Sequence, residues 1–389
     1  MRSERPRVTF VYWGRRGLSR FALDIVRAAL ADEGIRATVS VSRQNESFAA
    51  FAQLGEAVLP IDTFGMSAGA LLQAWRIPRV RARLLQHIAA HRTDVVIELM
   101  PHVWSSFVAP AVKAAGVGYV VMIHDAVPHP GDYRTAFAQW VMKRTLAQSD
   151  PILTLSSAVA AQIKASGQVP HDRIHPLFHP DIDFGSQPAL GPPGPGAPLR
   201  LAFFGRIMPY KGLPLFLDTV DELRRRGVAV DVGVFGEGAL GACAERLSSM
   251  GAEVINRWLT EAEMGKLLPR FHAVVLSHIE ASQSGVAAAA FGAGLPVIAT
   301  PVGGLIEQVQ DGETGVLAER VDSRALADAA ERLFSDAPLY ARIRHNISSR
   351  QADRSAARFV RACISAALRG RRETAGVRSP GPSAGDNGS

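Results

Sequence analysis

The sequence predicts an α/β fold made of two Rossmann-like, doubly wound domains that face each other across a central cleft. Short β-branched and apolar runs alternate with amphipathic helical stretches along most of the 389 residues. This alternation indicates parallel strands joined by crossover helices, because parallel neighbours need long connections. A segment rich in Pro and Gly, 186–198, interrupts the pattern, which then begins again. We therefore expect two sheets separated by a linker that does not pack.

The first domain is assigned to residues 1–185. Strands are predicted where β-branched and apolar residues cluster, at 8–13, 37–41, 94–99, 118–123 and 151–155. Helices are predicted where apolar residues recur at helical spacing, at 20–31, 105–115 and 136–146. The order of these elements is that of a parallel sheet covered by helices.

The second domain is assigned to residues 199–350. Its predicted strands are 199–204, 229–235, 273–276 and 296–300, and its predicted helices are 213–226, 239–250, 285–291 and 323–334. A C-terminal helix is expected within 351–370, with a path back to the first domain as one option. The tail, 371–389, is rich in Gly, Ser and Pro, and we expect it to be disordered.

Composition indicates a globular protein that binds anions. Hydrophobic residues make up 47% of the chain and charged residues 20%, which argues against a disordered protein. No apolar run reaches the length of about 20 residues that a membrane helix needs, and the first residues lack a signal-peptide profile. With only two cysteines, Cys243 and Cys363, far apart in the sequence, we expect a cytoplasmic protein without disulfides. The net charge of +7 favours nucleotides, phosphates or an acidic membrane face as partners, and no nucleic-acid-binding module is present.

The turn after the first strand of the second domain carries two cations. Gly205 allows a ligand to approach the backbone, and Arg206 and Lys211 precede the next helix. Such a place suits a diphosphate, since the N-terminus of a helix adds to the charge of the side chains. A solvated loop with two basic residues is the alternative. Gly236 ends the following strand in a turn that is common in α/β proteins.

A second candidate anion site lies where the apolar helix at 285–291 begins. Ser282 or Ser284 can cap this helix, and Gly285 in its first turn leaves the first backbone amides accessible, with Val286 next to it. Because the helix is apolar on all sides, we expect it to be buried with its N-terminus directed at the cleft. Glu280, just ahead of it, is placed to accept hydrogen bonds from ligand hydroxyls. The alternative is a capped core helix with Glu280 on the surface.

In the first domain, His124 follows a predicted strand directly and is expected to face the cleft, with Asp125 beside it. A hydrogen-bonded turn histidine is the alternative. Gly14 and Gly17 lie in a small basic turn after the first strand, which is weak evidence for a binding loop. Asp181 and Asp183 have the spacing of a metal-binding pair, but they lie beside the linker and we expect no metal ion.

Together these motifs resemble the GT-B glycosyltransferases, specifically the large retaining family 4 group. Order and spacing agree over about 110 residues of the second domain, at 204–212, 236–238, 279–285, 294–304, Glu307 and 311–315. The first domain agrees only in outline, through the turn at His124. The resemblance implies a GT-B architecture and a nucleotide-sugar substrate, with no other cofactor.

The resemblance also implies roles for individual residues. Arg206 and Lys211 would bind the diphosphate of the donor, Glu280 would face the donor sugar, and backbone amides near Ser284 would meet the phosphates. His124 would lie near the sugar at the reaction centre. We accordingly group His124, Glu280, Arg206 and Lys211 as catalytic. The donor-binding set is Gly205, Arg206, Lys211, Gly236, Glu280, Ser284, Gly285, Val286, Gly14 and Gly17.

One departure from the family pattern concerns the nucleotide ribose. Family members usually carry a second glutamate eight residues after the first, whereas this chain has Ala288 there and Ala289 next to it. A subgroup with a similar loop also lacks that glutamate, so the resemblance still implies activity. The ribose contact and the identity of the nucleotide stay open.

The function predicted is transfer of a sugar from a nucleotide-sugar to an acceptor hydroxyl, with retention and without metal, in the synthesis of a polysaccharide, glycolipid or other glycoconjugate. A nucleotide-sugar epimerase of the same fold, or a degenerate scaffold subunit that only binds, are the alternatives. The acceptor is expected to be a glycan or a lipid-linked molecule. The segment 75–85 mixes arginines with apolar residues, which suits either peripheral association with the inner face of a membrane or a solvated helix face.

Overall fold

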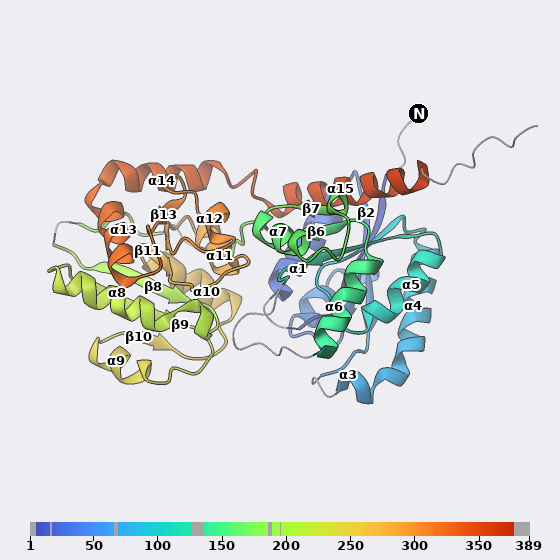
Figure 1. Cartoon of the computed structure of the whole chain (residues 1–389), viewed down its shortest axis with the longest axis horizontal. Coiled ribbons are helices and arrows are strands. Elements are labelled where there is room, and N and C mark those ends of the chain that lie inside the picture. Colours follow the sequence, from blue (N-terminus) through green and yellow to red (C-terminus); the bar gives the residue numbers. More distant parts are fainter. Residues whose placement is uncertain are drawn as a thin grey trace, which may run out of the picture.

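The computed structural model describes residues 5–15, 18–65, 69–126, 136–185, 189–194 and 196–376. Two α/β domains lie side by side, with the second domain at the left of Figure 1 and the first at the right. Each domain is built on one parallel sheet with helices on its faces. The predicted fold class is therefore confirmed.

The sheet of the first domain has seven parallel strands in the order β3-β2-β1-β4-β5-β6-β7. The strands are β1 (Arg7–Tyr12), β2 (Arg36–Ser42), β3 (Val58–Ile61), β4 (Val95–Glu98), β5 (Gly118–Ile123), β6 (Ile152–Thr154) and β7 (Ile174–Pro176). The α-helices that accompany them are α1 (Ser19–Ala31), α2 (Phe48–Ala52), α3 (Gly69–Leu72), α4 (Ile77–Ala90), α5 (Ser105–Ala114), α6 (Ala136–Gln148) and α7 (Ser157–Ala165). Short 3₁₀ turns are η1 (Gly55–Ala57), η2 (Ala74–Arg76) and η3 (His171–Arg173).

The sheet of the second domain has six parallel strands in the order β10-β9-β8-β11-β12-β13. The strands are β8 (Leu199–Phe204), β9 (Val230–Phe235), β10 (Glu253–Ile255), β11 (Ala273–Leu276), β12 (Val297–Ala299) and β13 (Gly315–Leu317). The helices are η4 (Pro209–Lys211), α8 (Leu213–Arg225), α9 (Cys243–Ser249), α10 (Glu261–Leu267), η5 (Leu268–Arg270), α11 (Gly285–Gly292), α12 (Leu305–Gln308), α13 (Ser323–Ser335) and α14 (Ala337–Ser349).

The direction in which strands are added reverses at one point in each sheet. In the first domain the reversal lies between β1 and β4, and in the second it lies between β8 and β11. Open parallel sheets bind ligands in the crevice beyond the carboxyl ends of such a pair. We therefore expect the ligand site in the loops that follow these four strands.

The C-terminal helix α15 (Ala356–Gly376) packs on α1 of the first domain. Its apolar side chains, Phe359 and Cys363 among them, are buried in the same core cluster as β1 and β2. In Figure 1, α14 lies over the second domain and α15 over the first. The helix extends beyond the predicted range, so residues 371–376 are helical, and the rest of the predicted tail, 377–389, lies outside the described residues.

The linker differs from its prediction in one respect. Its residues Ala189 and Leu190 lie against the second domain, where Ala189 is buried. The Leu190 amide donates to the Pro269 carbonyl at 3.1 Å, and the Arg344 guanidinium donates to the Leu190 carbonyl at 2.6 Å. Backbone groups that bond to a neighbouring helix end hold this segment in spite of its Pro and Gly content. The prediction of an unpacked linker is wrong for these residues.

Direct hydrogen bonds join the two domains next to the linker. The Ser156 hydroxyl donates to the Ser282 carbonyl at 2.7 Å. The Glu307 carboxylate accepts from the backbone amides of Ser157 and Ala158, at 2.9 and 3.0 Å, at the start of α7. A carboxylate at the N-terminus of a helix is favourable, because it satisfies amides that have no partner within the helix.

Two further observations concern membrane-spanning helices and metal sites. Within the described ranges, no helix is both long enough and apolar enough to span a bilayer. In the same part of the chain, no three His, Cys, Asp or Glu side chains are grouped as ligands of a metal ion.

Candidate active site

The turn after β8 brings three of the predicted donor-site residues into contact. Gly205 has a φ of +94°, and a Cβ at this position would lie 2.9 Å from both Lys211 Nζ and Val286 Cγ2. Glycine is therefore required here, because φ is positive and because there is no room for a side chain. The result is that the ammonium group of Lys211 lies over the backbone of the turn and next to the first turn of α11.

The position of Lys211 is set by the backbone around it. Lys211 ends η4, and Gly212, which follows in the left-handed conformation with a φ of 67°, is the N-cap of α8. The Ser277 hydroxyl, just after β11, lies within hydrogen-bond distance of the Lys211 and Gly212 carbonyls, at 3.1 and 2.9 Å. This contact links the loops after β8 and β11, the two strands at the switch point.

The electrostatics of this turn are those of an anion site. Burial of the ammonium, with a smaller contribution from the nearby Arg206 guanidinium, lowers the pKa of Lys211 to about 8. Arg206 itself is exposed. Two cations held close together without an anion repel each other, and a diphosphate between them would remove that repulsion.

Gly236 lies under the same turn. Its φ is +148°, and a Cβ there would lie 2.0 Å from the Gly205 carbonyl oxygen. The Gly205 amide in turn donates to the Phe235 carbonyl at 2.9 Å. Gly236 therefore supports the loop that carries Gly205, which places it beside the predicted donor site.

The N-terminus of α11 is built as predicted. Ser284 is the N-cap, and its hydroxyl accepts from the Ala287 amide at 3.3 Å. The apolar side chains from Val286 to Phe291 are buried, as the sequence predicts. Gly285 is exposed, with no atom within 4 Å of the place where its Cβ would be, so open space borders the first turn of this helix.

The sequence analysis predicted no role for Gln308. Its side chain binds Ser284, the N-cap residue of α11, from outside that helix. Its side-chain carbonyl accepts from the Ser284 amide at 2.9 Å, and its NH₂ group donates to the Ser284 carbonyl at 2.8 Å. Gln308 is buried. The only signal in the sequence is its position one residue after Glu307 in the motif at 301–307, which by itself does not indicate such a contact.

Glu280 lies in the loop between β11 and α11, with an exposed side chain. Its neighbour Ile279 donates its amide to the Tyr210 carbonyl at 2.7 Å, which ties this loop to η4. On the other side, Gly304 donates its amide to the Ala281 carbonyl at 2.9 Å. Glu280 is therefore fixed at the same sheet edge as Lys211, with its carboxylate at the surface.

The helix α11 offers no carboxylate for a ribose. Ala288 and Ala289 are both buried within it, and the Ala288 carbonyl accepts from the Ile182 amide at 3.0 Å. Ala288 and Ala289, which stand where the family usually has the second glutamate, thus lie in the buried part of α11.

His124 lies at the carboxyl end of β5, and it is more deeply buried than predicted, with 5% of its surface exposed. Its Nε2 is 2.7 Å from the Leu99 carbonyl, and its ring meets the edge of Phe21. Because a carbonyl can only accept, Nε2 carries the proton and Nδ1 is an acceptor. Among the described residues, buried Nδ1 has no hydrogen-bond partner, and burial lowers the pKa of His124, which favours the neutral ring.

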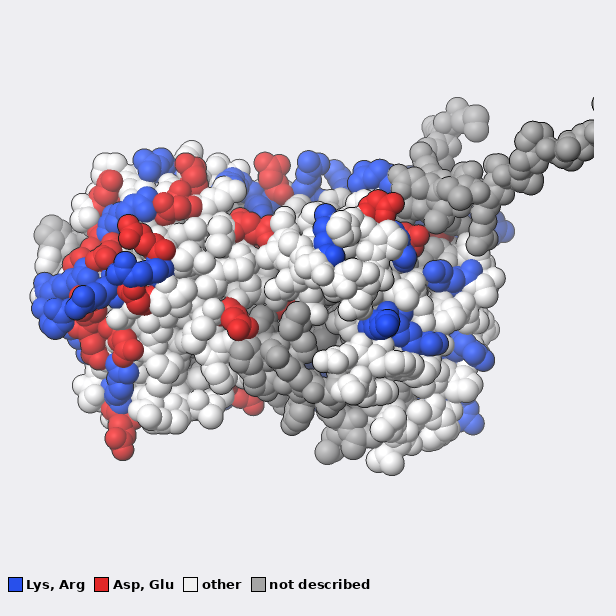
Figure 2. All heavy atoms as spheres, in the orientation of Figure 1, with Lys and Arg blue, Asp and Glu red and all other residues white. Residues whose placement is uncertain are grey.

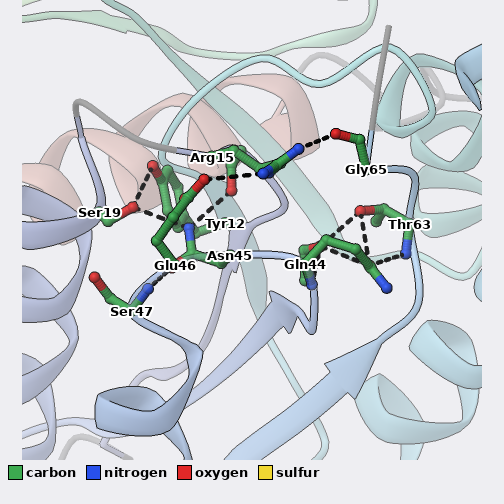
Figure 3. A network of polar contacts seen from close by, with 11 residues as sticks. Tyr12, Arg15, Ser19, Gln44, Asn45, Glu46, Ser47, Thr63 and Gly65 are labelled. Carbon is green, nitrogen blue, oxygen red and sulfur yellow. Dashed lines mark hydrogen bonds and ion pairs between the residues drawn. The ribbon is translucent and has the colours of Figure 1, made fainter. Parts of the chain in front are cut away.

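Gly14 follows β1 at the switch point of the first sheet. A Cβ there would lie 2.8 Å from Met100 Sδ, after β4, and the Asn45 side chain donates to the Gly14 carbonyl at 2.9 Å. Gly17 lies outside the described residues. Arg15 extends from this turn to Glu46, at 3.1 Å, and to the Gly65 carbonyl, so it joins the loops after β1, β2 and β3 (Figure 3).

A buried carboxylate at the end of β4 was also missed by the sequence analysis. Glu98 is fully buried and accepts from the His102 amide at 2.9 Å, from the Tyr119 hydroxyl at 2.5 Å and from the Ser105 hydroxyl. Burial raises the pKa of Glu98 to about 7, although these donors act in the opposite direction. A lone acid at the end of an apolar strand was the available signal.

The predicted residues therefore form two groups. Gly205, Lys211, Gly236, Ser284 and Val286 lie together in the second domain, with Glu280 and Arg206 at the same edge. His124 and Gly14 lie at the switch-point edge of the first domain. Within the described part of the chain, no hydrogen bond or ion pair joins His124 or Gly14 to the group in the second domain.

Comparison with known proteins places both domains in one family. A family model described as "Glycosyl transferases group 1" matches residues 198–336, and one described as "Glycosyl transferase 4-like domain" matches residues 16–177. An alpha-D-kanosaminyltransferase of Streptomyces kanamyceticus is 24% identical over 262 residues, which cover 60% of this chain and 66% of that protein. A D-inositol 3-phosphate glycosyltransferase of Corynebacterium diphtheriae is 35% identical over 156 residues, which cover 37% of this chain and 36% of that protein. The chain thus spans about two thirds of the first relative and about a third of the second.

Among solved structures, HepE of Anabaena, in complex with UDP and glucose, has the same fold. The TM-score is 0.70 at 17% identity, with 94% of this chain and 99% of that chain covered. Both sheets, the order of the motifs and the two family models agree. The chain belongs to the group 1, family 4-like glycosyltransferases of GT-B fold.

Proposed function

We propose that this chain transfers a sugar from a nucleotide-sugar to an acceptor hydroxyl, with retention of the anomeric configuration and without a metal ion. The observation that carries the proposal is the contact of Gly205, Lys211 and Val286 at the switch point of the second sheet. There a half-buried cation and the start of a buried helix converge on one space. The relatives named above are glycosyltransferases, which supports the same reaction class.

The diphosphate is the leaving group, and the turn after β8 is suited to stabilise it. As the bond between the anomeric carbon and the phosphate oxygen breaks, the sugar becomes oxocarbenium-like and negative charge grows on the diphosphate. Lys211, Arg206 and the amides that begin α11 are in place before that charge develops. Preorganised groups of this kind usually supply the largest catalytic contribution, and loss of one costs on the order of 10²–10³ in rate.

The sugar is bound by groups from both domains. Glu280, at the edge of the donor site, accepts hydrogen bonds from sugar hydroxyls. His124 offers Nδ1, the ring nitrogen that the protein leaves without a partner among the described residues, as an acceptor for a further hydroxyl. In this role His124 is neutral, and it positions the sugar without transferring a proton.

Retention requires the acceptor oxygen to bond to the anomeric carbon on the face that the diphosphate leaves. The acceptor hydroxyl then lies next to the departing phosphate oxygen, which takes its proton. Closure of the two domains would exclude water and so limit hydrolysis of the donor. The products are the glycosylated acceptor and the nucleoside diphosphate.

The first test is binding of UDP, GDP and ADP, measured by thermal shift and calorimetry. Wild type is compared with Lys211→Ala and with Lys266→Ala, which removes an exposed lysine of the same domain. We expect one nucleotide to raise the melting temperature of wild type and of Lys266→Ala, and to have much less effect on Lys211→Ala. If no nucleotide binds to the folded protein, the transferase proposal is wrong and the scaffold alternative is favoured.

The second test is turnover of the matching nucleotide-sugar. Transfer predicts that nucleoside diphosphate is released only with an acceptor present, and that the anomeric proton of the product keeps the coupling constant of the donor in NMR spectra. Release of nucleotide together with an altered free sugar, in the absence of acceptor, would identify an epimerase instead.

A further inference from the structure

An unusual surface lies on α3, η2 and the start of α4 in the first domain. Three apolar side chains project into solvent here, with Leu71 72%, Leu72 76% and Trp75 60% exposed. Large apolar side chains that cluster on a surface mark sites of interaction. The three lie within five consecutive residues, so they form one apolar tip.

Arginines surround this tip. The guanidinium groups of Arg76 and Arg79 lie over the Trp75 ring, at 5.3 and 5.2 Å from its centre. Arg83 lies one helical turn beyond Arg79 on α4 and is exposed. Among the described residues, none of these three arginines has an acidic partner within ion-pair distance. We refer to Leu71, Leu72, Trp75, Arg76, Arg79 and Arg83 as the apolar–arginine surface.

The wider face around this surface contains no acidic helix residue. The helices α4, α5 and α6 pack side by side, and none of them contains an Asp or Glu, whereas they carry Arg79, Arg81, Arg83, Lys113, Lys143 and Arg144. In the second domain, by contrast, exposed arginines pair with acids, as Arg246 does with Asp218 and Asp221 at 2.7 and 2.8 Å. Figure 2 shows blue and red mixed at the far left, over the second domain, whereas the charged atoms visible at the lower right, over the first, are blue.

The apolar–arginine surface is connected to the site edge of the first domain. The Trp104 indole donates to the Ala70 carbonyl at 2.9 Å, which fixes α3 to the start of α5. Phe64, just before α3, stacks on His102 at 4.9 Å between ring centres. His102 donates its amide to Glu98, at the carboxyl end of β4. These contacts connect the tip with the loop that follows β4.

We propose that the apolar–arginine surface binds an anionic lipid bilayer. Leucine and tryptophan side chains enter the boundary between headgroups and acyl chains, while the arginines beside them pair with lipid phosphates. A face on which the described helices α4, α5 and α6 carry basic but no acidic residues is attracted electrostatically to anionic lipid and not to a neutral surface. This inference goes beyond the proposed function, because it concerns where the first domain docks rather than how the donor is bound. Docking of the first domain on the membrane would bring an acceptor carried in the membrane to the edge of the cleft.

The test is cosedimentation of the full chain with vesicles, either of pure phosphatidylcholine or of equal parts phosphatidylcholine and phosphatidylglycerol. We expect binding to the anionic vesicles only, weakened by salt. Trp75→Ser should lower that binding several-fold, and Arg79→Gln with Arg83→Gln should lower it roughly fivefold per arginine. The second domain supplies matched controls in Trp258→Ser, a tryptophan that is 48% exposed, and in its neighbour Arg257→Gln. Both controls should bind as wild type does.

Three results of the vesicle assay would overturn the proposal: no binding to anionic vesicles, equal binding to both compositions, or equal losses of binding in the Trp258 and Trp75 variants. Self-association without lipid that is lost in Trp75→Ser would also overturn it, in favour of a second copy of the chain. Nucleotide binding by each variant, measured by calorimetry, should match wild type. Failure of the lipid proposal is therefore distinguishable from failure of the donor site.

Discussion

Gln308 holds Ser284 by both backbone groups, accepting from its amide at 2.9 Å and donating to its carbonyl at 2.8 Å. Ser284 is the N-cap of α11, whose first turn faces the turn of Gly205 and Lys211. The residue before Gln308, Glu307, binds the start of α7 in the other domain. The short helix α12 therefore contacts the donor-site helix and the first domain through adjacent residues.

Replacing Gln308 should disturb the donor site. Gln308→Ala leaves the buried amide of Ser284 without its partner, while the Ser284 carbonyl keeps only the Ala288 amide at 3.3 Å. An unsatisfied buried amide costs about 1–3 kcal/mol of unfolding free energy. We expect a lower melting temperature together with weaker nucleotide binding, because the start of α11 is no longer fixed. Gln310→Ala, two residues along and exposed, is the control. Unchanged nucleotide affinity in Gln308→Ala would show that α11 keeps its place without the clamp.

The protonation of Lys211 should make nucleotide binding depend on pH. Its pKa in the free protein is lowered to about 8, and a bound diphosphate favours the charged form and raises that pKa. As the pH rises through 8, the free protein loses the charge that the nucleotide needs, so affinity falls, by up to about tenfold per pH unit. At pH 8 binding should take up about half a proton, which calorimetry in buffers of different ionisation enthalpy measures. Lys211→Ala should show neither effect, and Lys266→Ala should show both.

Adding one methyl group at Gly205 should damage the site more than the fold. A Cβ there meets Lys211 Nζ and Val286 Cγ2 at 2.9 Å, with φ at +94°. Gly227 has a similar φ of +85° and nothing within 4 Å of its Cβ position, so Gly227→Ala carries the same backbone strain without the contact. Both variants should lose about 1–2 kcal/mol of stability. Only Gly205→Ala should lose nucleotide affinity and transferase activity, and an equal loss in both would contradict this account.

Glu307 should protect the start of α7 from exchange with solvent. Its carboxylate accepts from the amides of Ser157 and Ala158, at 2.9 and 3.0 Å. In Glu307→Ala these amides should exchange faster with deuterium, while the melting temperature changes little, because the contact is exposed to solvent. Glu319→Ala removes another exposed acid of the second domain and should leave the exchange rates unchanged. If the amides of Ser157 and Ala158 exchange as slowly in Glu307→Ala as in wild type, the contact between the domains depends on Ser156 and its neighbours instead.

The sequence by itself determined the fold class, and it singled out Gly205, Lys211 and Val286, which the structure places together at one sheet edge. Interior strands such as β1, β8 and β11 are buried on both faces, so they appear as apolar runs that a local pattern reveals. The four strands that were not predicted, β3, β7, β10 and β13, are the four outer strands of the two sheets. An outer strand is short and has fewer neighbours to pack against, so its residues carry little β-strand signal. The glycines and basic residues of the candidate site could be picked out because they directly follow interior strands, whose apolar runs are recognisable in the sequence.

Tertiary structure alone decided the contacts between distant residues. Gln308 reaches Ser284 from the separate short helix α12, Glu98 gains its three donors through folding, and His124 turns its Nε2 toward Leu99. Packing also placed α15 on α1, although more than 300 residues separate them in the chain. A hydrogen bond depends on position and direction in space, and residue type and local spacing specify neither across such distances. The charge and exposure of the surface at Trp75 likewise depend on which helices become neighbours.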